Sequence, residues 1–247
     1  MTDQAQAPAT PARMPWRAAT VASMMRETPS AATLYFDVEG WPGHRAGQHV
    51  DVRLTAEDGY QAQRSYSIAS APEEPGLAIT VERLLDGEVS PYLVDDAQAG
   101  DVVEIRGPVG GWFVWETTEG GPLWLIGGGS GVVPLRSMLR HHQLAGSDIP
   151  ARLLLSAKAP RDVVYRAELQ SWDVTYTYTR ETPPGWTGYA RRVDREMLAE
   201  SGFAPGERPR IFVCGPTGFV EGVADDLTRL GHDPVRVRTE RFGATGG

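Results

Sequence analysis

The sequence predicts two domains, an N-terminal antiparallel β-barrel followed by an open α/β sheet of parallel strands. Three observations support this prediction. Short alternating apolar segments separated by turn residues fill the first half, as in an antiparallel sheet. From about Pro122, apolar segments alternate with helical patterns, which is typical of βαβ units. A Thr/Glu/Gly-rich stretch between Trp115 and Pro122 separates the two patterns, so we place the domains at residues 16–118 and 119–247.

Six short strands and one brief helix account for the first domain. Turn signals such as Asp58-Gly59 and Asp86-Gly87 separate the strands, and their number favours a closed barrel. Ser90 is a good N-cap for the brief helix, and Pro91 suits its first turn, where a missing N–H group is harmless. The expected strands are Trp16–Met25, Ala32–Val38, His49–Leu54, Ser65–Ala69, Ala78–Leu84 and Val102–Arg106.

The second domain is predicted to contain five strands and four helices. The expected strands are Leu123–Ile126, Arg152–Ser156, Val174–Tyr178, Ile211–Cys214 and Val235–Thr239. The expected helices are Pro134–Leu144, Asp162–Ser171, Asp194–Ala199 and Gly218–Leu230. A glycine-rich turn, Gly127 to Gly131, joins the first strand to the first helix. Such turns often serve only tight packing, but they also present backbone N–H groups to a dinucleotide pyrophosphate.

The composition excludes several classes of protein. A net charge of −8 without any basic run argues against a nucleic-acid-binding protein. No stretch approaches the roughly 18 apolar residues of a membrane span, and residues 1–15 predict a disordered leader rather than a signal peptide. The single Cys214 excludes an internal disulfide and an iron–sulfur cluster held by this chain's thiolates. We expect a cytoplasmic, monomeric protein without a metal site.

A second nucleotide site of different architecture is indicated by Arg64-Ser65-Tyr66-Ser67. Alternation along a strand places Arg64 and Tyr66 on one face. Arg64 could bind a phosphate, and Tyr66 could lie flat against an isoalloxazine ring. Ser67 could donate a hydrogen bond near flavin N5. The turn before the brief helix, Gly87 to Ser90, exposes N–H groups that favour a phosphate. Each pattern alone is more often an ordinary strand or helix start, but together they indicate redox chemistry.

In this order, the motifs resemble those of the ferredoxin–NADP reductase family, in which a flavin-binding barrel precedes a pyridine-nucleotide domain. The resemblance runs from about Trp16 to Phe242. The matching motifs are Arg64-Ser65-Tyr66-Ser67, Thr80-Val81-Glu82-Arg83, Gly87-Glu88-Val89-Ser90, the Gly127–Pro134 loop, Cys214-Gly215-Pro216 and Glu240-Arg241-Phe242. The resemblance implies bound FAD, with FMN as the alternative, and a nicotinamide dinucleotide as the second ligand.

The resemblance also implies individual roles. The expected flavin-site residues are Arg64, Ser65, Tyr66, Ser67, Thr80, Val81, Glu82, Gly87, Glu88, Val89, Ser90 and Phe242. Those expected around the dinucleotide are Gly129, Ser130, Gly131, Thr179, Arg180, Cys214, Gly215 and Pro216. Ser67, Cys214, Glu240 and Phe242 form the expected catalytic set, with Phe242 as a movable lid on the flavin. Glu82 departs from relatives that carry a basic residue, and Gly243–Gly247 extend beyond the usual terminal aromatic residue.

Two of these positions have alternative interpretations. A lone buried cysteine is usually an inert apolar residue, but Cys214 ends a strand at the edge where ligands bind in α/β sheets. It is not expected to be a nucleophile, since the sequence reveals no histidine–acid partner. Thr179-Arg180 favours NADPH, with Arg180 bonding the 2′-phosphate, backed by Arg191 or Arg192. The alternative for Arg180 is a solvated charge at a strand end.

The predicted function is that of an NAD(P)H-dependent flavoprotein reductase, with NADPH preferred. Hydride passes to the flavin, and electrons leave to a separate acceptor. That acceptor could be a ferredoxin, a haem protein, another metal-cofactor protein or a small molecule. The alternatives are a reductase of free flavin or quinone, and a flavin-binding module without catalytic activity.

Overall fold

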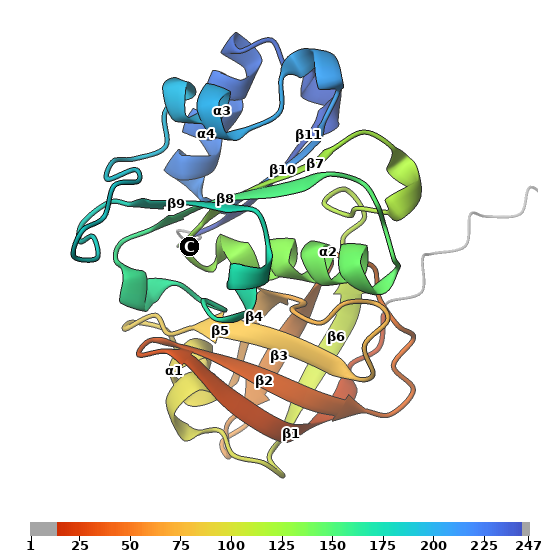
Figure 1. The fold of residues 1–247 in the computed structure, drawn as a ribbon. Coiled ribbons are helices and arrows are strands. Elements are labelled where there is room, and N and C mark those ends of the chain that lie inside the picture. Colours follow the sequence, from red (N-terminus) through yellow and green to blue (C-terminus); the bar gives the residue numbers. More distant parts are fainter. Residues whose placement is uncertain (1–13, 244–247) are drawn as a thin grey trace, which may run out of the picture.

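The computed structural model describes residues 14–243 and shows a β-barrel beneath a parallel sheet (Figure 1). The six barrel strands are β1 (Arg17–Thr28), β2 (Ala31–Val38), β3 (His49–Thr55), β4 (Gln61–Ser67), β5 (Leu77–Glu82) and β6 (Val102–Val109). They form an antiparallel sheet in the order β4-β3-β6-β1-β2-β5. The predicted antiparallel sheet of six strands is confirmed.

The barrel closes where its edge strands β4 and β5 meet. Ile68 and Ile79 form an antiparallel bridge, and Ala69 N donates to Ala78 O over 2.8 Å. Inward-facing residues alternate along every strand, and they fill the interior with apolar side chains such as Leu34, Val52 and Ile79, all fully buried. The closing bridge immediately follows Ser67, so the flavin motif lies at the seam of the barrel.

The second domain is an open sheet of parallel strands in the order β11-β10-β7-β8-β9. Its strands are β7 (Leu123–Gly128), β8 (Ala151–Ala157), β9 (Val174–Tyr178), β10 (Arg210–Pro216) and β11 (Val237–Phe242). Its helices are α2 (Val132–Leu144), α3 (Arg195–Ser201) and α4 (Thr217–Arg229). The strand order reverses between β7 and β10, which is the switch point where α/β sheets bind ligands.

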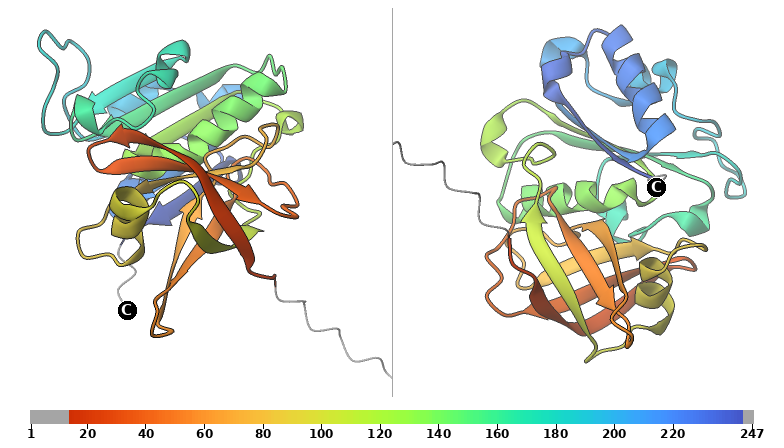
Figure 2. Two further views of the ribbon diagram at one scale, coloured as in Figure 1. Left: turned by 90° about the horizontal axis from the view of Figure 1, so that it is seen from below. Right: turned by 180° about the vertical axis from the view of Figure 1, so that it is seen from behind.

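The helices divide between the two faces of this sheet. Helix α2 lies between the sheet and the barrel, whereas α3 and α4 cover the opposite face (Figures 1 and 2). Helix α2 is hydrogen-bonded directly to the barrel. Arg136 Nη1 donates to Ala69 O over 2.8 Å, and Ser137 Oγ donates to Ser70 O over 2.7 Å. The parallel α/β domain is therefore fixed to the chain segment that follows the flavin motif.

The predicted helix over Asp162–Ser171 is wrong. The structure has only two short 3₁₀ turns there, Pro160–Asp162 and Glu168–Ser171. Between them Tyr165 adopts a positive φ of 60°, which interrupts any helix, and its side chain is almost fully buried. Tertiary contacts of this loop with the barrel override its helical pattern.

Two smaller predictions also need correction. Ser90 is not an N-cap: it lies inside the short helix α1 (Val89–Pro91), which continues as a π-helical segment over Tyr92–Asp96. Its hydroxyl instead accepts a hydrogen bond from Leu84 N at 3.0 Å. The last strand begins later than expected, at Val237, because Asp233 caps a 3₁₀ turn over Pro234–Arg236.

The remaining elements agree with their predicted positions within a few residues, and Asp194 caps α3 by accepting from Met197 N. Within residues 14–243, no helix is long and apolar enough to cross a membrane. The predicted leader, residues 1–15, falls almost entirely outside the described residues.

Gly47 lies where the barrel, the interdomain linker and α2 meet. Its φ is +99°, and an added Cβ would lie 2.0 Å from Phe113 O and 2.6 Å from Met138 Cε. Trp115 N donates to the neighbouring Ala46 O over 3.2 Å, so the linker is held against this turn. Gly43 also has a positive φ, +79°, but an added Cβ there meets nothing within 4 Å.

We therefore expect Gly47→Ala to destabilise the protein much more than Gly43→Ala. Both substitutions place an alanine in the left-handed region, at about 1–2 kcal/mol. Only Gly47→Ala adds an overpacking penalty, a further ~1–3 kcal/mol. Urea unfolding of both variants gives the comparison, and equal losses would contradict the close packing at Gly47.

Candidate functional site

The flavin motif lies at the carboxyl end of β4, with its cation and aromatic ring near each other. Arg64 is exposed and donates only to Gln63 O among the described residues, so its charge is available to a phosphate. Tyr66 is half-buried against the barrel core. Burial raises the pKa of Tyr66, and the charge of Arg64 opposes this rise. The expected pairing of Arg64 and Tyr66 on one face agrees with this geometry.

The turn at Gly87–Ser90, with the helix α1 that it enters, packs against β4, the strand that carries Arg64. Tyr60 Oη donates to the Glu88 carboxylate at 3.1 Å, which raises the pKa of Tyr60, and the Arg64 charge again opposes the rise. Arg64 therefore lies close to both tyrosines and to this turn. Gly87 is tightly placed, since an added Cβ would lie 2.9 Å from Ser90 Oγ. The two phosphate-binding candidates of the sequence come together at one edge of the barrel.

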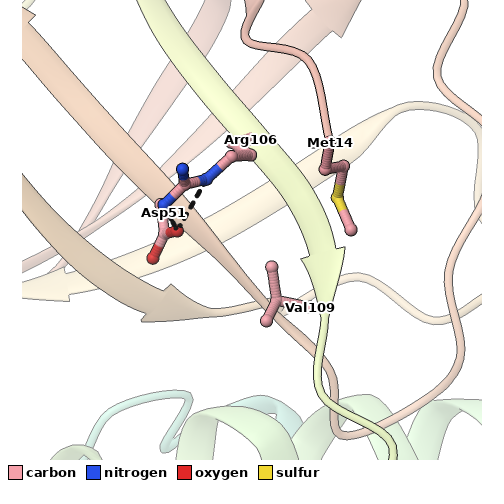
Figure 3. Close-up of a pocket in the computed structure, with 4 residues that line it drawn as sticks. All are labelled: Met14, Asp51, Arg106 and Val109. Carbon is pink, nitrogen blue, oxygen red and sulfur yellow. Dashed lines mark hydrogen bonds and ion pairs between the residues drawn. The ribbon is translucent and has the colours of Figure 1, made fainter. Parts of the chain in front are cut away.

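Ser65 turns away from the expected flavin face. Its hydroxyl donates to Asp51 Oδ1 over 2.6 Å, and Asp51 Oδ2 accepts from Arg106 over 2.7 Å. Asp51 and Arg106 border a cavity of about 490 Å³, together with Met14 and Val109 (Figure 3). The Ser65 side chain therefore stabilises the barrel surface, and only its backbone is free to take part in a flavin site.

Strand β5 has a similar division of roles. Val81 lies in the barrel core, completely buried. Thr80 points outward but is also buried, with its hydroxyl bonded to Thr33 Oγ1 and to Tyr165 Oη. Of the three residues expected to line the flavin, only Glu82 is partly exposed. The polar contacts of Thr80 join it to the second domain.

The glycine loop and the Cys214 motif meet at the switch point of the second sheet. Gly129 has a φ of +57°, which favours glycine, and it stays exposed while Gly131 is buried. An added Cβ at Gly131 would lie 2.2 Å from Cys214 O. One at Gly215 would lie 2.7 Å from the Phe219 ring, a contact that sequence reasoning missed. Glycine is therefore required for these two motifs to approach each other.

Cys214 and Glu240 are register partners on the parallel strands β10 and β11. Burial, and then the charge of Glu240, raise the pKa of the Cys214 thiol well above its ordinary value. Burial also raises the pKa of Glu240 to about 7. A thiol kept neutral is a poor nucleophile, so the expectation that Cys214 does not act as one agrees with its surroundings.

A histidine–acid pair does exist, although no pattern in the sequence indicated it. His49 Nδ1 lies 3.8 Å from Glu240 Oε1, across the junction between the domains. His49 is also the register partner of Ser67 on strands β3 and β4. Burial lowers the pKa of His49, and Asp51 opposes this effect. Only the packing of β11 against the barrel creates this contact, so no local pattern could have revealed it.

Glu240 has one further feature that fits a bound ligand. Its Oε2 atom is buried and has no hydrogen-bond partner among the described residues. An orphaned buried oxygen is unfavourable unless a donor reaches it. A carboxamide N–H₂ group, as in nicotinamide, supplies such a donor, so the residues at this junction fit a nicotinamide ring.

Phe242 ends β11 beside Pro216, its register partner, and its side chain remains 37% exposed. It is therefore not a packed core residue. Most of the extension beyond the terminal aromatic residue, residues 244–247, lies outside the described residues.

Thr179 and Arg180 follow β9, and both are exposed. Their backbone N–H groups donate to Ala157 O and Lys158 O, each over 2.9 Å. Arg180 forms no ion pair within residues 14–243, and the neighbouring Glu181 is paired with Arg161. Arg191 is already bonded to Asp194 and Glu196, which leaves Arg192 as the expected second cation.

Comparisons with known proteins agree with this division of the chain. Residues 19–114 match the family model of an oxidoreductase FAD-binding domain, and residues 125–225 match that of an oxidoreductase NAD-binding domain. The chain is 32% identical over 210 residues to the ferredoxin–NADP reductase B of Sorangium cellulosum, covering 80% of this chain and 84% of that protein.

A second relative is the glycine betaine monooxygenase reductase subunit of Chromohalobacter salexigens, 32% identical over 212 residues. This match covers 81% of the chain but only 56% of that relative, so the chain spans little more than half of its length. Among solved structures, the flavohaem-like FAD/NAD-binding domain of a nitric oxide dioxygenase from Vibrio cholerae superposes with a TM-score of 0.80 at 25% identity. That match covers 92% of this chain and 98% of the other. The chain therefore belongs to the ferredoxin–NADP reductase-like family of flavin oxidoreductases, with an FAD-binding barrel followed by an NAD-binding domain.

Proposed function

We propose that this protein takes a hydride from NAD(P)H onto bound FAD and delivers electrons to a separate acceptor protein. One observation carries the proposal: the flavin and nicotinamide motifs converge at the domain junction. Ser67 pairs in register with His49, His49 lies 3.8 Å from Glu240, and Glu240 pairs in register with Cys214. A chain that only binds flavin has no need for this convergence.

Bound flavin supplies the chemistry, because it accepts two electrons as a hydride and can release them singly. The protein supplies binding and orientation. Arg64 and the Gly87–Ser90 turn would hold the flavin phosphates, and Tyr66 would support the ring. The loop at Gly129–Gly131 would hold the dinucleotide pyrophosphate, and Phe242 would cover the open flavin face as a lid.

Glu240 and His49 would control protons at the junction. Because burial raises the pKa of Glu240 to about 7, its carboxyl would exist in both the protonated and the ionised form near neutral pH. A protonated Glu240 can donate a hydrogen bond from one oxygen and accept one at the other. His49 would connect this carboxyl to Asp51, which borders the cavity of Figure 3. This arrangement would give the reacting edge a carboxyl that can take up or release a proton near neutral pH.

We propose NADPH as the preferred donor. Arg180 is the exposed cation at the end of β9, and the adjacent acid, Glu181, is paired with Arg161. A free guanidinium suits the 2′-phosphate that distinguishes NADPH from NADH. Arg192 would provide a second contact, since Arg191 is bonded within its own loop.

We propose that the acceptor is a metal-cofactor protein of an oxygenase system or a ferredoxin. Several relatives are named as such components, including an electron transfer component of a toluate 1,2-dioxygenase and a ferredoxin reductase component of a 3-ketosteroid monooxygenase. The 247 residues contain a single cysteine, so they cannot by themselves hold a cluster that needs several thiolates.

The first test is an absorbance spectrum of the purified protein before and after anaerobic NADPH. We expect flavin absorbance that NADPH bleaches. Arg64→Ala should weaken flavin retention by about 1.5–3 kcal/mol, because a charge-assisted phosphate contact is lost. Arg229→Ala, which removes a surface charge on α4, is the control. A flavin that NADPH and NADH fail to bleach would refute the proposed reaction, and full flavin retention in Arg64→Ala would refute the role of Arg64.

Arg180→Ala tests the nucleotide preference. We expect its KM for NADPH to rise about tenfold, since a charge-assisted contact contributes about 1.5 kcal/mol or more. The KM for NADH should stay nearly unchanged, which makes NADH the internal control. Steady-state kinetics with both donors decide the question: equal losses would place Arg180 elsewhere, and a wild-type preference for NADH would overturn the proposal.

Glu240→Gln tests the raised pKa through stability. Folding favours the protonated carboxyl, so the stability from this group is complete below pH 4.5 and is lost as the pH rises through about 7. Glutamine stays neutral and avoids this loss, at most about 3 kcal/mol. The Tm of the wild type should therefore fall relative to Glu240→Gln between pH 5 and 8. Glu57→Gln, in an exposed loop, is the control, and parallel profiles for wild type and Glu240→Gln would contradict the assignment.

A further inference from the structure

A closed circuit of hydrogen bonds connects the barrel with the second domain. Tyr165 Oη is bonded to Thr80 Oγ1, and Thr80 Oγ1 lies 2.8 Å from Thr33 Oγ1. Thr33 Oγ1 lies 2.7 Å from Glu27 Oε1, and Tyr165 N donates to Glu27 Oε2 over 3.3 Å. The circuit therefore begins and ends at Tyr165, the one member that belongs to the second domain.

The chemistry of these groups fixes the direction of each bond. An ionised carboxylate only accepts, so Thr33 donates its single hydroxyl hydrogen to Glu27. Thr33 must then accept from Thr80, and Thr80 must accept from Tyr165. All three hydroxyl groups thus point the same way, toward a carboxylate, which is the arrangement in which hydrogen bonds polarise and strengthen one another.

Tyr165 is held in a conformation that only these contacts explain. Its φ of 60° is unusual for an aromatic residue, and its side chain is 4% exposed. The Arg136 guanidinium lies 4.7 Å from the centre of its ring. Arg136 is itself buried, bonded to Glu168 over 2.8 Å and to Ala69 O on the barrel. Backbone strain of this kind persists where the surroundings determine it and concentrates at functional sites.

The circuit lies between the barrel strands that carry the flavin motifs and the glycine turn that precedes α2. Thr80 is on β5, which contacts the glycine turn at Gly129–Gly131. Arg136 is on α2, which begins directly after that turn, and it holds Ala69, two residues beyond Ser67. The strands at the barrel seam and the start of the dinucleotide helix are therefore connected through Tyr165 and its stacked arginine.

We propose that Tyr165 is a positioning residue that sets the distance between the nicotinamide and flavin sites. It touches neither of the expected reacting groups, and acts by fixing β5 against the second domain. The proposal rests on the proposed hydride transfer. Hydride transfer depends steeply on geometry, since a misplacement of about 1 Å lowers rates by about a hundredfold.

The test is Tyr165→Phe in the flavin-loaded protein. This variant removes the hydroxyl but keeps the ring beneath Arg136. We expect the rate of flavin reduction in stopped-flow experiments to fall about ten- to a hundredfold, while the Kd for NADP⁺ stays within about twofold. The matched control is Tyr189→Phe, which breaks a hydroxyl contact with Glu200 inside the second domain. An unchanged reduction rate in Tyr165→Phe would overturn the proposal, as would an equal loss in Tyr189→Phe.

A second pair of variants distinguishes loss of the circuit from a general folding defect. Thr33→Val breaks the circuit inside the barrel, and Thr33→Ser retains the hydroxyl. We expect reduction to slow in Thr33→Val and to recover in Thr33→Ser. A slow rate in both, or in neither, would contradict a role for the circuit.

Hydrogen exchange of the flavin-loaded protein gives a readout that does not depend on activity. Tyr165→Phe should exchange faster than the wild type at residues 77–82 and 160–168, where the circuit holds the backbone. Unchanged exchange would refute the circuit as a link between domains. Wild-type flavin that neither NADPH nor NADH reduces would refute the proposed function instead, and the exchange comparison would still test the circuit.

Discussion

The architecture depends on a buried charge, Arg136, at the junction between the domains. Its side chain is 7% exposed, so its buried charge requires partners. Glu168 neutralises it, Ala69 O accepts from it, and the Tyr165 ring stacks on it. Arg136 is on α2, and its partners come from the barrel (Ala69) and from the loop after β8 (Tyr165 and Glu168). A buried arginine with fixed partners tolerates little movement, so it holds two sheets of different topology in one relative position.

The same junction is surrounded by further ion pairs that reinforce α2 against the barrel. Arg140 is bonded to Glu74 and Glu168, and His141 Nδ1 lies 2.6 Å from Glu73 Oε1. The contacts with Glu73 and Glu74 reach the segment after Ser67, which connects β4 to β5, whereas Glu168 lies in the loop after β8. The strands that carry the flavin motifs are consequently held by the domain that binds the dinucleotide. Both sites therefore depend on the same packing of α2 against the barrel.

At the candidate site, burial affects the protonation of side chains as well as their packing. Cys214 is buried and Glu240 and His49 are partly buried, and burial favours the neutral form of each. A junction of neutral groups can exchange protons without strong repulsion of a negatively charged dinucleotide. The charged groups lie at the periphery, where Arg64 and Arg180 face the expected phosphates. The charged side chains therefore lie where the phosphates of the two ligands are expected, and the neutral side chains lie where the two reacting rings are expected to meet.

The sequence by itself determined the features that depend on local sterics and local hydrogen bonds. Strand alternation and the glycine loop at Gly127–Gly131 are local, and both were found where they were expected. The order of the motifs was enough to predict both domains and their family. These features need only a few neighbouring residues, whose conformational preferences the sequence carries directly.

Only the tertiary structure decided which side chains meet. His49 and Glu240 are far apart in the chain, and no periodic pattern connects them. Strand alternation places Ser65 on the face opposite Arg64 and Tyr66, but only the fold supplies Asp51 as the partner of its hydroxyl. The loop at Tyr165 has a helical pattern, yet its contacts with the barrel give it an irregular path. In each case the deciding energy comes from burying and pairing groups brought together by folding, and local sequence does not encode that energy.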